Sequence, residues 1–361
     1  MYWLPAILIL PYIYILLKIY KSLLKIRPFT FTTDPKTSVS VVVACRNEQK
    51  YLPSLLNSLA HQNYPLDLFE VLIVNDNSTD KTLEIAAGFK RADNIRVLEN
   101  NGEGKKQALR TGITEARGNL IITTDADCTA GKNWIRTIAG YYEMNNPDLI
   151  ISPVQIKPEP GFFGKFIELE FISLQGITAG TALSERGTMC NGANLAFTRE
   201  AYLSHSDNLH DEINTGDDIF LLHSLKREPD SKILWLESQD AVITTESPIT
   251  FKSFLKQRSR WISKGKVYTD IYTIILGIST FLAIMVHIGF LIAWIIRPSL
   301  IWVLLSVIVL KSIPDLLILL NTTKRYGKKE LMRWFLPSQL IYSFYVISIL
   351  IYTLISREKG S

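Results

Sequence analysis

Acidic residues that directly follow apolar runs are the first candidates for chemistry in this 361-residue chain. Asp125 and Asp127 stand two positions apart after one such run, and Asp76 follows another. Two carboxylates from one loop can hold Mg²⁺ or Mn²⁺, whose remaining positions are filled by water and phosphate. A D-x-D pattern in isolation is usually a turn, but its position at the end of an expected strand favours a metal site.

A second acidic pattern precedes an apolar helix expected at residues 219–225. Asp217 and Asp218 would ordinarily cap that helix, whereas a functional Asp218 would be a general base that takes a proton from a hydroxyl nucleophile. Lys105 follows a glycine-containing loop and begins another expected helix. A cation with flexible backbone at that position suits contact with phosphate or ribose, although an ordinary loop has the same composition.

Basic and aromatic residues gather at residues 257–261, just before a long apolar stretch. One interpretation is an interfacial helix whose Arg258, Arg260 and Trp261 are anchored at lipid headgroups. The other is a wall of an active site, with Trp261 stacked on a sugar face and Arg260 on a diphosphate. Residues 191–194 are either a plain turn or a place where the chain comes close to an acceptor.

Alternating strands and helices must position these groups. The hydrophobic patterns predict strands at 38–44, 69–74, 95–98 and 120–124, and helices at 48–62, 82–89 and 105–116. Strands and helices that alternate at short spacing indicate an α/β fold with a mostly parallel sheet. Ligands of such sheets bind outside the carboxyl ends of the strands, where the acidic residues stand. P-loop and dinucleotide-binding motifs are absent from the sequence.

The composition points to a membrane. The chain is 47% hydrophobic and 20% charged, and its middle, residues 37–251, carries a net charge of −10 between basic ends of +4 and +11. This pattern excludes a disordered chain or a disulfide scaffold, and it argues against nucleic acid as a partner. Four apolar stretches are expected to span a bilayer: residues 1–17, 271–296, 298–320 and 334–356.

Basic residues flank these stretches on one side, so the positive-inside rule predicts a cytosolic middle with both termini outside. Lys311 and Asp315 interrupt the third span at a spacing of four, which would let them pair on one helix face. Pro314 leaves open a re-entrant hairpin there. Residues 161–175 are expected to form an amphipathic helix that lies on the membrane.

Six motifs, in order, resemble a membrane-bound, inverting family 2 glycosyltransferase. This superfamily includes the cellulose, hyaluronan and poly-N-acetylglucosamine synthases and ceramide glucosyltransferase. The resemblance covers roughly residues 38–268 and rests on these motifs: Arg-Asn-Glu at 46–48, Asn-Asp-Asn-Ser-Thr-Asp at 75–80, Gly-Lys at 104–105, Asp-Ala-Asp at 125–127, Gly-Asp-Asp at 216–218 and Gln-x-x-Arg-Trp at 257–261. Arg46 departs from the family, because many relatives have an aromatic or small residue there.

The resemblance implies a GT-A-type, Rossmann-like catalytic domain at residues 36–250. This domain would lie in the cytosol, and the protein would be integral to a bacterial-type inner or plasma membrane. The other parts would be an anchor at 1–26, an interfacial segment at 251–268 and three transmembrane helices at 269–356. The roles that it implies are as follows: Asp218 as catalytic base; Glu48, Asp76, Lys105, Asp125 and Arg260 for the nucleotide sugar; Gln257, Trp261, Asp217 and Asn194 for the acceptor; Asp127, with Asp125, for Mg²⁺ or Mn²⁺.

The implied reaction transfers a sugar from a UDP-sugar to a membrane-associated or lipid-linked acceptor and forms a β-glycosidic bond. Three alternatives stay open. The chain could extend a β-linked polysaccharide processively, it could bind nucleotide without turnover, or it could be a metal-dependent phosphoryl or nucleotidyl transferase. The donor sugar and the oligomeric state are not determined by these motifs.

Overall fold

The computed structural model describes residues 4–31, 33–89, 94–206 and 216–358. The chain divides into two compact units. The sheet unit comprises residues 26–157 and 189–246, and the helical unit comprises residues 1–25, 158–188 and 247–361. The expected domain at 36–250 therefore contains a segment, residues 158–188, that belongs to the helical unit.

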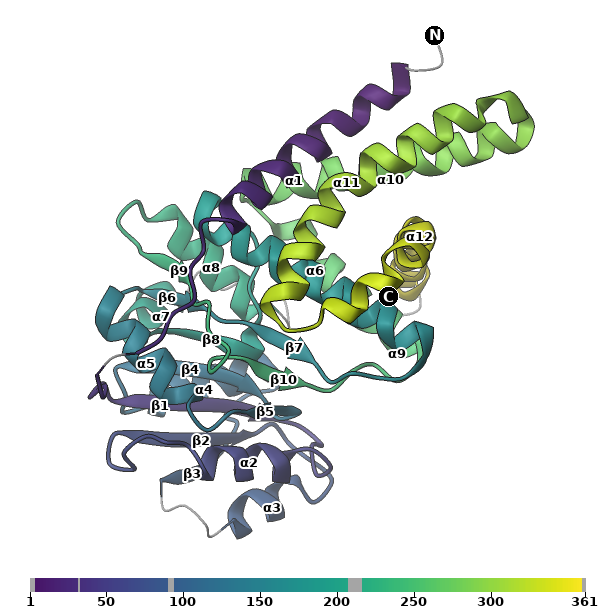
Figure 1. The fold of residues 1–361 in the computed structure, drawn as a ribbon. Helices are drawn as coiled ribbons and strands as arrows, with labels where there is room; N and C mark the ends of the chain where they lie inside the picture. Colours follow the sequence, from purple (N-terminus) through teal and green to yellow (C-terminus); the bar gives the residue numbers. More distant parts are fainter. Residues whose placement is uncertain (1–3, 32, 90–93, 207–215, 359–361) are drawn as a thin grey trace. The chain divides into compact units, whose positions relative to one another are not determined.

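The sheet unit contains two sheets with helices around them (Figure 1). The larger sheet has seven strands in the order β3-β2-β1-β4-β8-β6-β9, and the smaller has the order β5-β10-β7. Its strands are: β1 Val39–Cys45, β2 Phe69–Asn75, β3 Ile95–Glu99, β4 Leu120–Asp125, β5 Cys128–Ala130, β6 Leu149–Ile151, β7 Val154–Ile156, β8 Leu195–Thr198, β9 Ile233–Trp235 and β10 Ile243–Thr245. Its helices are: α2 Leu52–Ala60, α3 Thr82–Gly88, α4 Lys105–Glu115, α5 Trp134–Asn145, η2 Gly192–Asn194, α7 Arg199–His205 and α8 Asp217–Arg227.

β1 occupies the position on which the site depends. It runs parallel to β2 on one side and to β4 on the other, with Cys45 opposite Asn75 and Ala44 opposite Asp125. Its branched side chains are buried, as expected of a strand covered on both faces. The chain therefore leaves all three strands at the same edge. The predicted α/β fold with a mostly parallel sheet is confirmed, while β8 adds antiparallel pairing to β4 and β6.

The helical unit is built from long helices. Its elements are: η1 Leu4–Ile9, α1 Leu10–Leu23, α6 Gly161–Glu185, α9 Phe251–Ser263, η4 Lys264–Val267, α10 Ile271–Ile296, η5 Pro298–Leu300, α11 Ile301–Arg325, η6 Lys329–Trp334 and α12 Phe335–Glu358. α6 corrects the expectation of a surface helix at 161–175. It is ten residues longer, fifteen of its residues are buried, and it packs against both α1 and α11.

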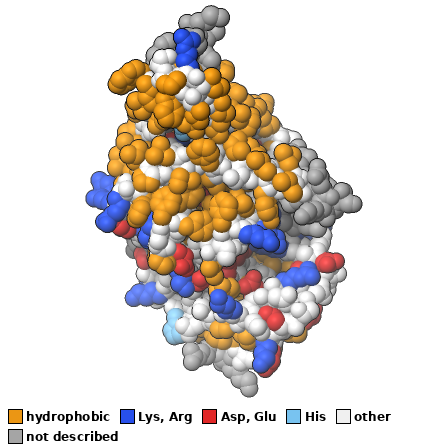
Figure 2. Space-filling view, turned by 90° about the vertical axis from the view of Figure 1, so that its right-hand side faces the viewer, with side chains coloured by type: hydrophobic (Ala, Val, Ile, Leu, Met, Phe, Trp, Pro, Cys, Tyr) orange, Lys and Arg blue, Asp and Glu red, His pale blue; other side chains and the backbone are white. Residues whose placement is uncertain are grey.

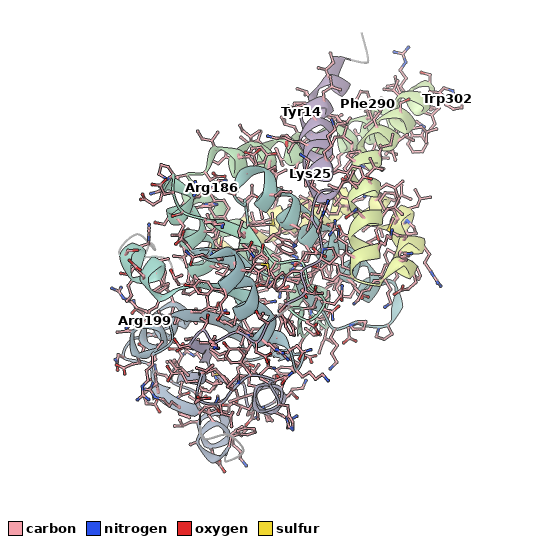
Figure 3. All side chains as sticks on the ribbon, turned by 60° about the vertical axis from the view of Figure 1, so that its left-hand side comes forward. Tyr14, Lys25, Arg186, Arg199, Phe290 and Trp302 are labelled. Carbon is pink, nitrogen blue, oxygen red and sulfur yellow. The ribbon has the colours of Figure 1, made fainter. Side chains whose placement is uncertain are left out.

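Among the residues that the structure describes, three helical segments are long and apolar enough to cross a membrane. They are Ile271–Ile296, Pro298–Arg325 and Lys329–Ile355, and they match the last three expected spans. The expected first span is not among them, since α1 has 14 residues. Large hydrophobic side chains, such as Ile296 and Trp302, are exposed on these segments. Figure 2 shows hydrophobic side chains gathered on one face, and Figure 3 shows Trp302 at the end where α10 and α11 join.

The polar residues inside α11 are paired. The predicted contact of Lys311 with Asp315 is present, with 3.0 Å between Nζ and Oδ2. α11 continues through Pro314 as one helix, so the structure does not contain the re-entrant hairpin that the proline left open. Lys311 is buried and Asp315 is partly buried, and each charge stabilises the other.

Two glycines let α6 approach its neighbours closely. A Cβ atom at Gly180 would lie 2.5 Å from Ile19 Cγ2 and 2.8 Å from the Ile19 carbonyl oxygen on α1. A Cβ atom at Gly176 would lie 2.4 Å from Thr322 Oγ1 on α11. These distances are shorter than van der Waals contact. Any side chain at Gly176 or Gly180 would therefore occupy the space on α6 into which α11 and α1 pack.

We therefore expect Gly180→Ala to destabilise the detergent-purified protein by about 1–3 kcal/mol, because the added methyl group meets the backbone of α1. The matched control is Gly277→Ala in α10, where a Cβ atom would meet nothing within 4 Å. Thermal unfolding monitored by circular dichroism measures both variants. Equal midpoints for the two variants would contradict the close packing of α1 on α6.

Candidate functional site

The loops after β1 and β2 are joined by side-chain to backbone hydrogen bonds. Asn47 adopts a left-handed conformation, with φ of 59°, which asparagine tolerates better than most residues. Its backbone N–H donates to Ser78 Oγ at 3.1 Å, and its Oδ1 accepts from the backbone N–H of Thr79 at 2.8 Å. These hydrogen bonds tie the two loops together at Asn47, which lies between Arg46 and Glu48.

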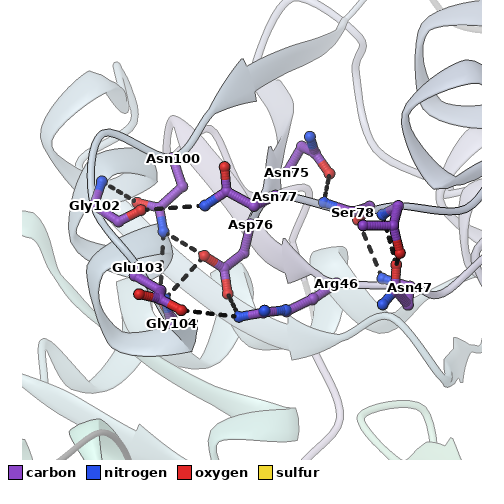
Figure 4. A network of polar contacts seen from close by, with 11 residues as sticks. Arg46, Asn47, Asn75, Asp76, Asn77, Ser78, Asn100, Gly102, Glu103 and Gly104 are labelled. Carbon is purple, nitrogen blue, oxygen red and sulfur yellow. Dashed lines mark hydrogen bonds and ion pairs between the residues drawn. The ribbon is translucent and has the colours of Figure 1, made fainter.

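Asp76 organises the polar network drawn in Figure 4. Its side chain is 3% exposed. Its Oδ1 accepts from Asn100 Nδ2 at 2.7 Å and from the backbone N–H of Gly104 at 2.9 Å. Its Oδ2 lies 3.6 Å from Arg46 Nη1, and Arg46 also pairs with the exposed Glu103. One oxygen of Asp76 therefore fixes the loop before α4, while the other faces a guanidinium beyond hydrogen-bonding distance.

Three carboxylates at the ends of β1 and β4 repel one another. Burial, together with Asp127, Asp125 and Asp80, raises the pKa of Glu48 to about 7. Burial, together with Asp125, raises the pKa of Asp127 to about 6. Such shifts mean that negative charge gathers here with incomplete compensation, which is the environment that a bound cation relieves.

Lys105, the first residue of α4, is the cation that the chain itself supplies to this edge. Its Nζ forms an ion pair with Asp125, and its side chain is 43% exposed. Burial would lower the pKa of Lys105, but Asp125, Asp217 and Asp218 raise it above its usual value. Lys105 therefore lies within electrostatic reach of both acidic patterns that the sequence singled out.

Asp218 is held by backbone donors at the start of α8. Its Oδ2 accepts from the backbone N–H of Gly192 at 3.1 Å, and its Oδ1 accepts from the N–H of Ile219 at 2.8 Å. The carbonyl of Gly192 in turn accepts from Thr123 Oγ1 on β4 at 2.9 Å. Two backbone N–H groups therefore orient the carboxylate of Asp218 at the N-terminus of α8.

The carboxylates fit a divalent cation. Within the described residues, no group of three or more His, Cys, Asp and Glu side chains surrounds one point. Mg²⁺ does not need one, because it often takes one or two carboxylates and completes its shell with water and phosphate. Asp125 and Asp127, with their shared excess of negative charge, have the donor atoms that such an ion prefers.

Asn194 has a structural environment. The residue is 0% exposed, its Oδ1 accepts from Trp134 Nε1 at 2.9 Å, and its Nδ2 donates to the carbonyls of Pro153 and Ala241 at 2.7 and 2.8 Å. These hydrogen bonds tie together the segments that contain Trp134, Pro153 and Ala241. The side chain of Asn194 could bind a ligand only if these hydrogen bonds broke. The side chain of Asn194 is committed to these contacts, and the expected approach of the chain at this residue to an acceptor stays a prediction.

The residues of the Gln-x-x-Arg-Trp motif lie together on α9 of the helical unit. Gln257 is partly buried, Arg260 is exposed, and Trp261 is partly buried. Their contribution to the nucleotide sugar and the acceptor stays a prediction.

The intervening Arg258 does not anchor at a lipid headgroup. It is buried, its Nε donates to Glu170 on α6 at 3.1 Å, and it lies 4.1 Å from the centre of the Trp261 ring. Sequence reasoning missed this pair, because residues 88 positions apart give no local pattern.

Comparisons with known proteins add the family. Residues 40–205 match the family model described as Glycosyl transferase family 2. The chain carries a family 2 glycosyltransferase domain. The prediction of that family is thereby confirmed for the part of the chain that contains Glu48, Asp76, Lys105, Asp125 and Asp127.

Two relatives are similar in sequence to this glycosyltransferase domain. The poly(ribitol-phosphate) beta-N-acetylglucosaminyltransferase TarS of Staphylococcus aureus is 33% identical over 114 residues, which are 31% of this chain and 20% of that protein. Glycosyltransferase AglE of Haloferax volcanii is 28% identical over 231 residues, 63% of this chain and 73% of that protein. The chain thus spans about a fifth of the first relative and nearly three quarters of the second.

A mannosyltransferase from Pyrobaculum calidifontis, PcManGT, was solved in complex with GDP-Man and Mn²⁺. The two chains are 18% identical with a TM-score of 0.56, and the match covers 97% of this chain and 98% of that one. At this identity the likeness shows a shared fold. The predicted GT-A-type fold is confirmed.

The raised pKa values of Glu48 and Asp127 predict a pH-dependent stability. Both folded-state values exceed the unfolded ones, so folding favours the protonated carboxyls and the metal-free protein loses stability as pH rises from about 4.5 to 7. We expect the unfolding midpoint in a chelator to fall over this range, by about 2–4 °C for each 1 kcal/mol lost.

Glu48→Gln removes one of the repelling charges, so its midpoint should fall less over the same range. Glu103→Gln is the control, because Glu103 is 82% exposed. Calorimetry at about pH 5, 6, 7 and 8 measures the unfolding midpoint of the wild type and of both variants. Parallel pH profiles for wild type and Glu48→Gln would contradict the proposed repulsion.

Proposed function

We propose that the glycosyltransferase domain transfers a sugar, with inversion, from a nucleotide sugar to an acceptor hydroxyl. The observation that carries this proposal is the position of Lys105, which pairs with Asp125 and is also influenced by Asp218. An inverting transfer needs a base on the acceptor side and positive charge on the diphosphate side. Asp218 suits the first role, and Lys105 beside Asp125 and Asp127 suits the second.

In the proposed reaction, Asp218 accepts the proton of the acceptor hydroxyl as the acceptor oxygen attacks the anomeric carbon. The bond between that carbon and the diphosphate oxygen breaks, and the nucleoside diphosphate leaves with the bonding electron pair. The backbone N–H groups of Gly192 and Ile219 keep the carboxylate of Asp218 oriented. Lys105 stabilises the negative charge that grows on the leaving diphosphate.

Asp125 and Asp127 would hold Mg²⁺ or Mn²⁺, and the ion, when bound, would neutralise the leaving diphosphate. Support comes from the elevated pKa of Asp127, which reflects negative charge in need of a cation. The related PcManGT structure contains Mn²⁺ with GDP-Man. For this chain we propose a UDP-sugar as the donor.

Arg46 and Asp76 suit a base that presents a ring N–H beside a carbonyl. Asp76 Oδ2 can accept from that N–H, and the adjacent guanidinium of Arg46 can donate to the carbonyl. Uracil and guanine have this arrangement. Cytosine and adenine present a ring nitrogen lone pair to the carboxylate, so their binding would leave Asp76 unpaired and cost affinity.

The acceptor is proposed to be membrane-associated or lipid-linked. Three candidate spans in the helical unit support a location at a membrane, and the basic residues beside them support a cytosolic sheet unit. An additional span at residues 1–17 and a bacterial-type inner membrane remain part of the proposal. Gln257, Arg260 and Trp261 would close over diphosphate and acceptor, with Asp217 on the acceptor side.

Three alternatives are distinguished from this activity by what each one releases or produces. A processive polysaccharide synthase would yield a ladder of chain lengths, whereas a single transfer yields one product. A phosphoryl or nucleotidyl transferase would release phosphate or pyrophosphate in place of UDP. A silent nucleotide-binding protein would bind UDP-sugar and release nothing when lipid extract is added.

Asp218→Asn should lower acceptor-dependent UDP release by about 10²–10⁴-fold, because the amide cannot take the proton. Its affinity for the nucleotide sugar should stay within about threefold of wild type, since Asp218 is assigned to the acceptor hydroxyl and the amide oxygen keeps one of the two backbone hydrogen bonds. A coupled UDP assay with lipid extract measures turnover, and titration calorimetry measures binding. Normal turnover by Asp218→Asn would refute the assignment.

Asp127→Ala provides the opposite pattern and serves as the matched control for Asp218→Asn. It should lose the gain in UDP affinity that Mn²⁺ provides, because one carboxylate ligand is gone. Asp240→Asn, at an exposed position, should leave both turnover and binding unchanged. If Mn²⁺ still raised the UDP affinity of Asp127→Ala as in the wild type, Asp127 would not be a ligand of the metal.

The base proposal predicts that UDP and GDP compete with the donor at least about tenfold better than CDP and ADP. Asp76→Asn should reduce the preference for UDP over CDP, because the amide can turn a donor toward the base. Arg46→Gln should weaken the binding of UDP without changing its dependence on Mn²⁺. Competition by the four diphosphates against a fluorescent UDP probe gives the ratios, and equal affinity for all four would refute the proposal.

A further inference from the structure

Arg258, which stands inside the Gln-x-x-Arg-Trp motif, donates hydrogen bonds from every nitrogen of its guanidinium. The residue is 4% exposed. Its Nε and Nη2 donate to the two carboxylate oxygens of Glu170 on α6, with 3.1 Å between Nε and Oε1. Its Nη1 donates to Oε1 of Gln257 at 2.7 Å. A planar, forked donor is needed for this set of contacts, so a lysine could not reproduce them.

The carboxylate that binds Arg258 is itself held by a third helix. Glu170 is 8% exposed, and its Oε1 also accepts from the hydroxyl of Tyr345 on α12 at 3.1 Å. The ring of Tyr345 stacks on Phe254, with 5.1 Å between the ring centres and 14° between the planes. The guanidinium carbon of Arg258 lies 4.8 Å from the centre of the Phe254 ring. Side chains of α6, α9 and α12 therefore restrain the guanidinium together.

Arg258 also packs against Trp261, which lies one turn further along α9. Its guanidinium carbon is 4.1 Å from the centre of the Trp261 ring, within the range of a cation–π contact. Because the guanidinium covers one face of this ring, a ligand can stack only on the other face. Trp261 is partly buried, so part of its side chain is accessible to a ligand.

The hydrogen bond to Gln257 decides which end of that amide is presented. Since Oε1 of Gln257 accepts from Arg258, the amide N–H groups are the part of the side chain that can meet a ligand. These groups donate, so they suit oxygen atoms of a ligand. Arg258 therefore orients the residues on either side of it in the motif, Gln257 and Trp261.

We propose that Arg258, held by Glu170, is a positioning residue for the acceptor: it sets the accessible ring face of Trp261 and the direction of the Gln257 amide. This inference rests on the proposed function, in which Gln257 and Trp261 contact the acceptor. Arg258 acts through these two side chains, because it is buried and its nitrogens already donate within the helical unit.

An ion pair with a structural role alone would have different consequences. Arg258 and Glu170 are both buried, so the loss of one charge leaves the other unpaired and destabilises the helical unit. Such destabilisation would disturb α9 as a whole, including Arg260, which is proposed to bind the donor. Positioning predicts instead that the loss is confined to the acceptor.

The test is acceptor-dependent UDP release by the full chain in detergent, with the UDP-sugar and the lipid extract varied in turn. Arg258→Lys keeps the positive charge but has one nitrogen in place of the planar fork. The amount of lipid extract that gives half-maximal release should rise about tenfold. The KM for the UDP-sugar should change by less than about twofold. An equal rise in the two quantities would overturn the inference.

Glu170→Gln combined with Arg258→Gln separates positioning from stability. Both buried charges are removed, so the unfolding midpoint should stay within about 3 °C of wild type. The half-maximal amount of lipid extract should still be raised, because the shorter amide does not replace the guanidinium beside Trp261. Wild-type behaviour of this double variant toward lipid extract would overturn the inference.

Lys311→Met is the matched control, because it breaks another ion pair of the helical unit, that of Lys311 with Asp315. It should lower the unfolding midpoint and leave the half-maximal amount of lipid extract and the KM for the UDP-sugar unchanged. A rise in the half-maximal amount of lipid extract equal to that of Arg258→Lys would show that loss of stability alone explains the effect and would overturn the inference.

Fluorine NMR measures the position of Trp261 without turnover. In protein labelled with fluorotryptophan, the resonance of Trp261 is the one that Trp261→Phe removes. Arg258→Lys should shift or broaden this resonance and leave that of the buried Trp134, assigned in the same way, unchanged. An unchanged Trp261 resonance would overturn the inference. Absence of UDP release by wild type would refute the proposed function, and the fluorine spectrum would then decide the positioning of the ring by itself.

Discussion

Repulsion among Glu48, Asp125 and Asp127 is the interaction on which the sheet unit depends for its chemistry. Parallel strands on both sides of β1 end at the same edge and leave these carboxylates close together, so the protonated forms of Glu48 and Asp127 are favoured. Folding creates this repulsion, and Lys105 offsets part of it. A site with such residual charge has affinity for a cation that arrives with an anionic diphosphate, which joins metal and donor in one event.

The helical unit treats buried charge in the opposite way. Lys311 and Asp315, like Arg258 and Glu170, are paired within the unit, and each pair has further hydrogen bonds. Complete pairing fixes how the helices pack, because removing one partner would leave the other charge without a counter-charge in an apolar environment. The close contact of α6 with α1 at Gly180 adds a steric constraint.

Most of the sheet unit could be predicted from local patterns. The four expected strands begin and end within one residue of β1 to β4, because apolar runs of that length are stable only when covered on both faces. The short strands β6, β8 and β9 could not be predicted this way, since three or four residues carry too little periodicity. The α6 helix was expected to be shorter and exposed, because its polar residues Glu168 and Glu170 resemble a surface pattern until their buried partners are known.

The sequence by itself determined the chemistry on offer: which carboxylates follow strands, which lysine begins a helix, and which segments are apolar enough for a membrane. Tertiary structure decided which of these groups act together. It committed Asn194 to hydrogen bonds with Trp134, Pro153 and Ala241, and it paired Arg258 with Glu170. The physical reason is that hydrogen bonds and ion pairs depend on distances of about 3 Å, which residues far apart in the chain reach only after the strands and helices have packed.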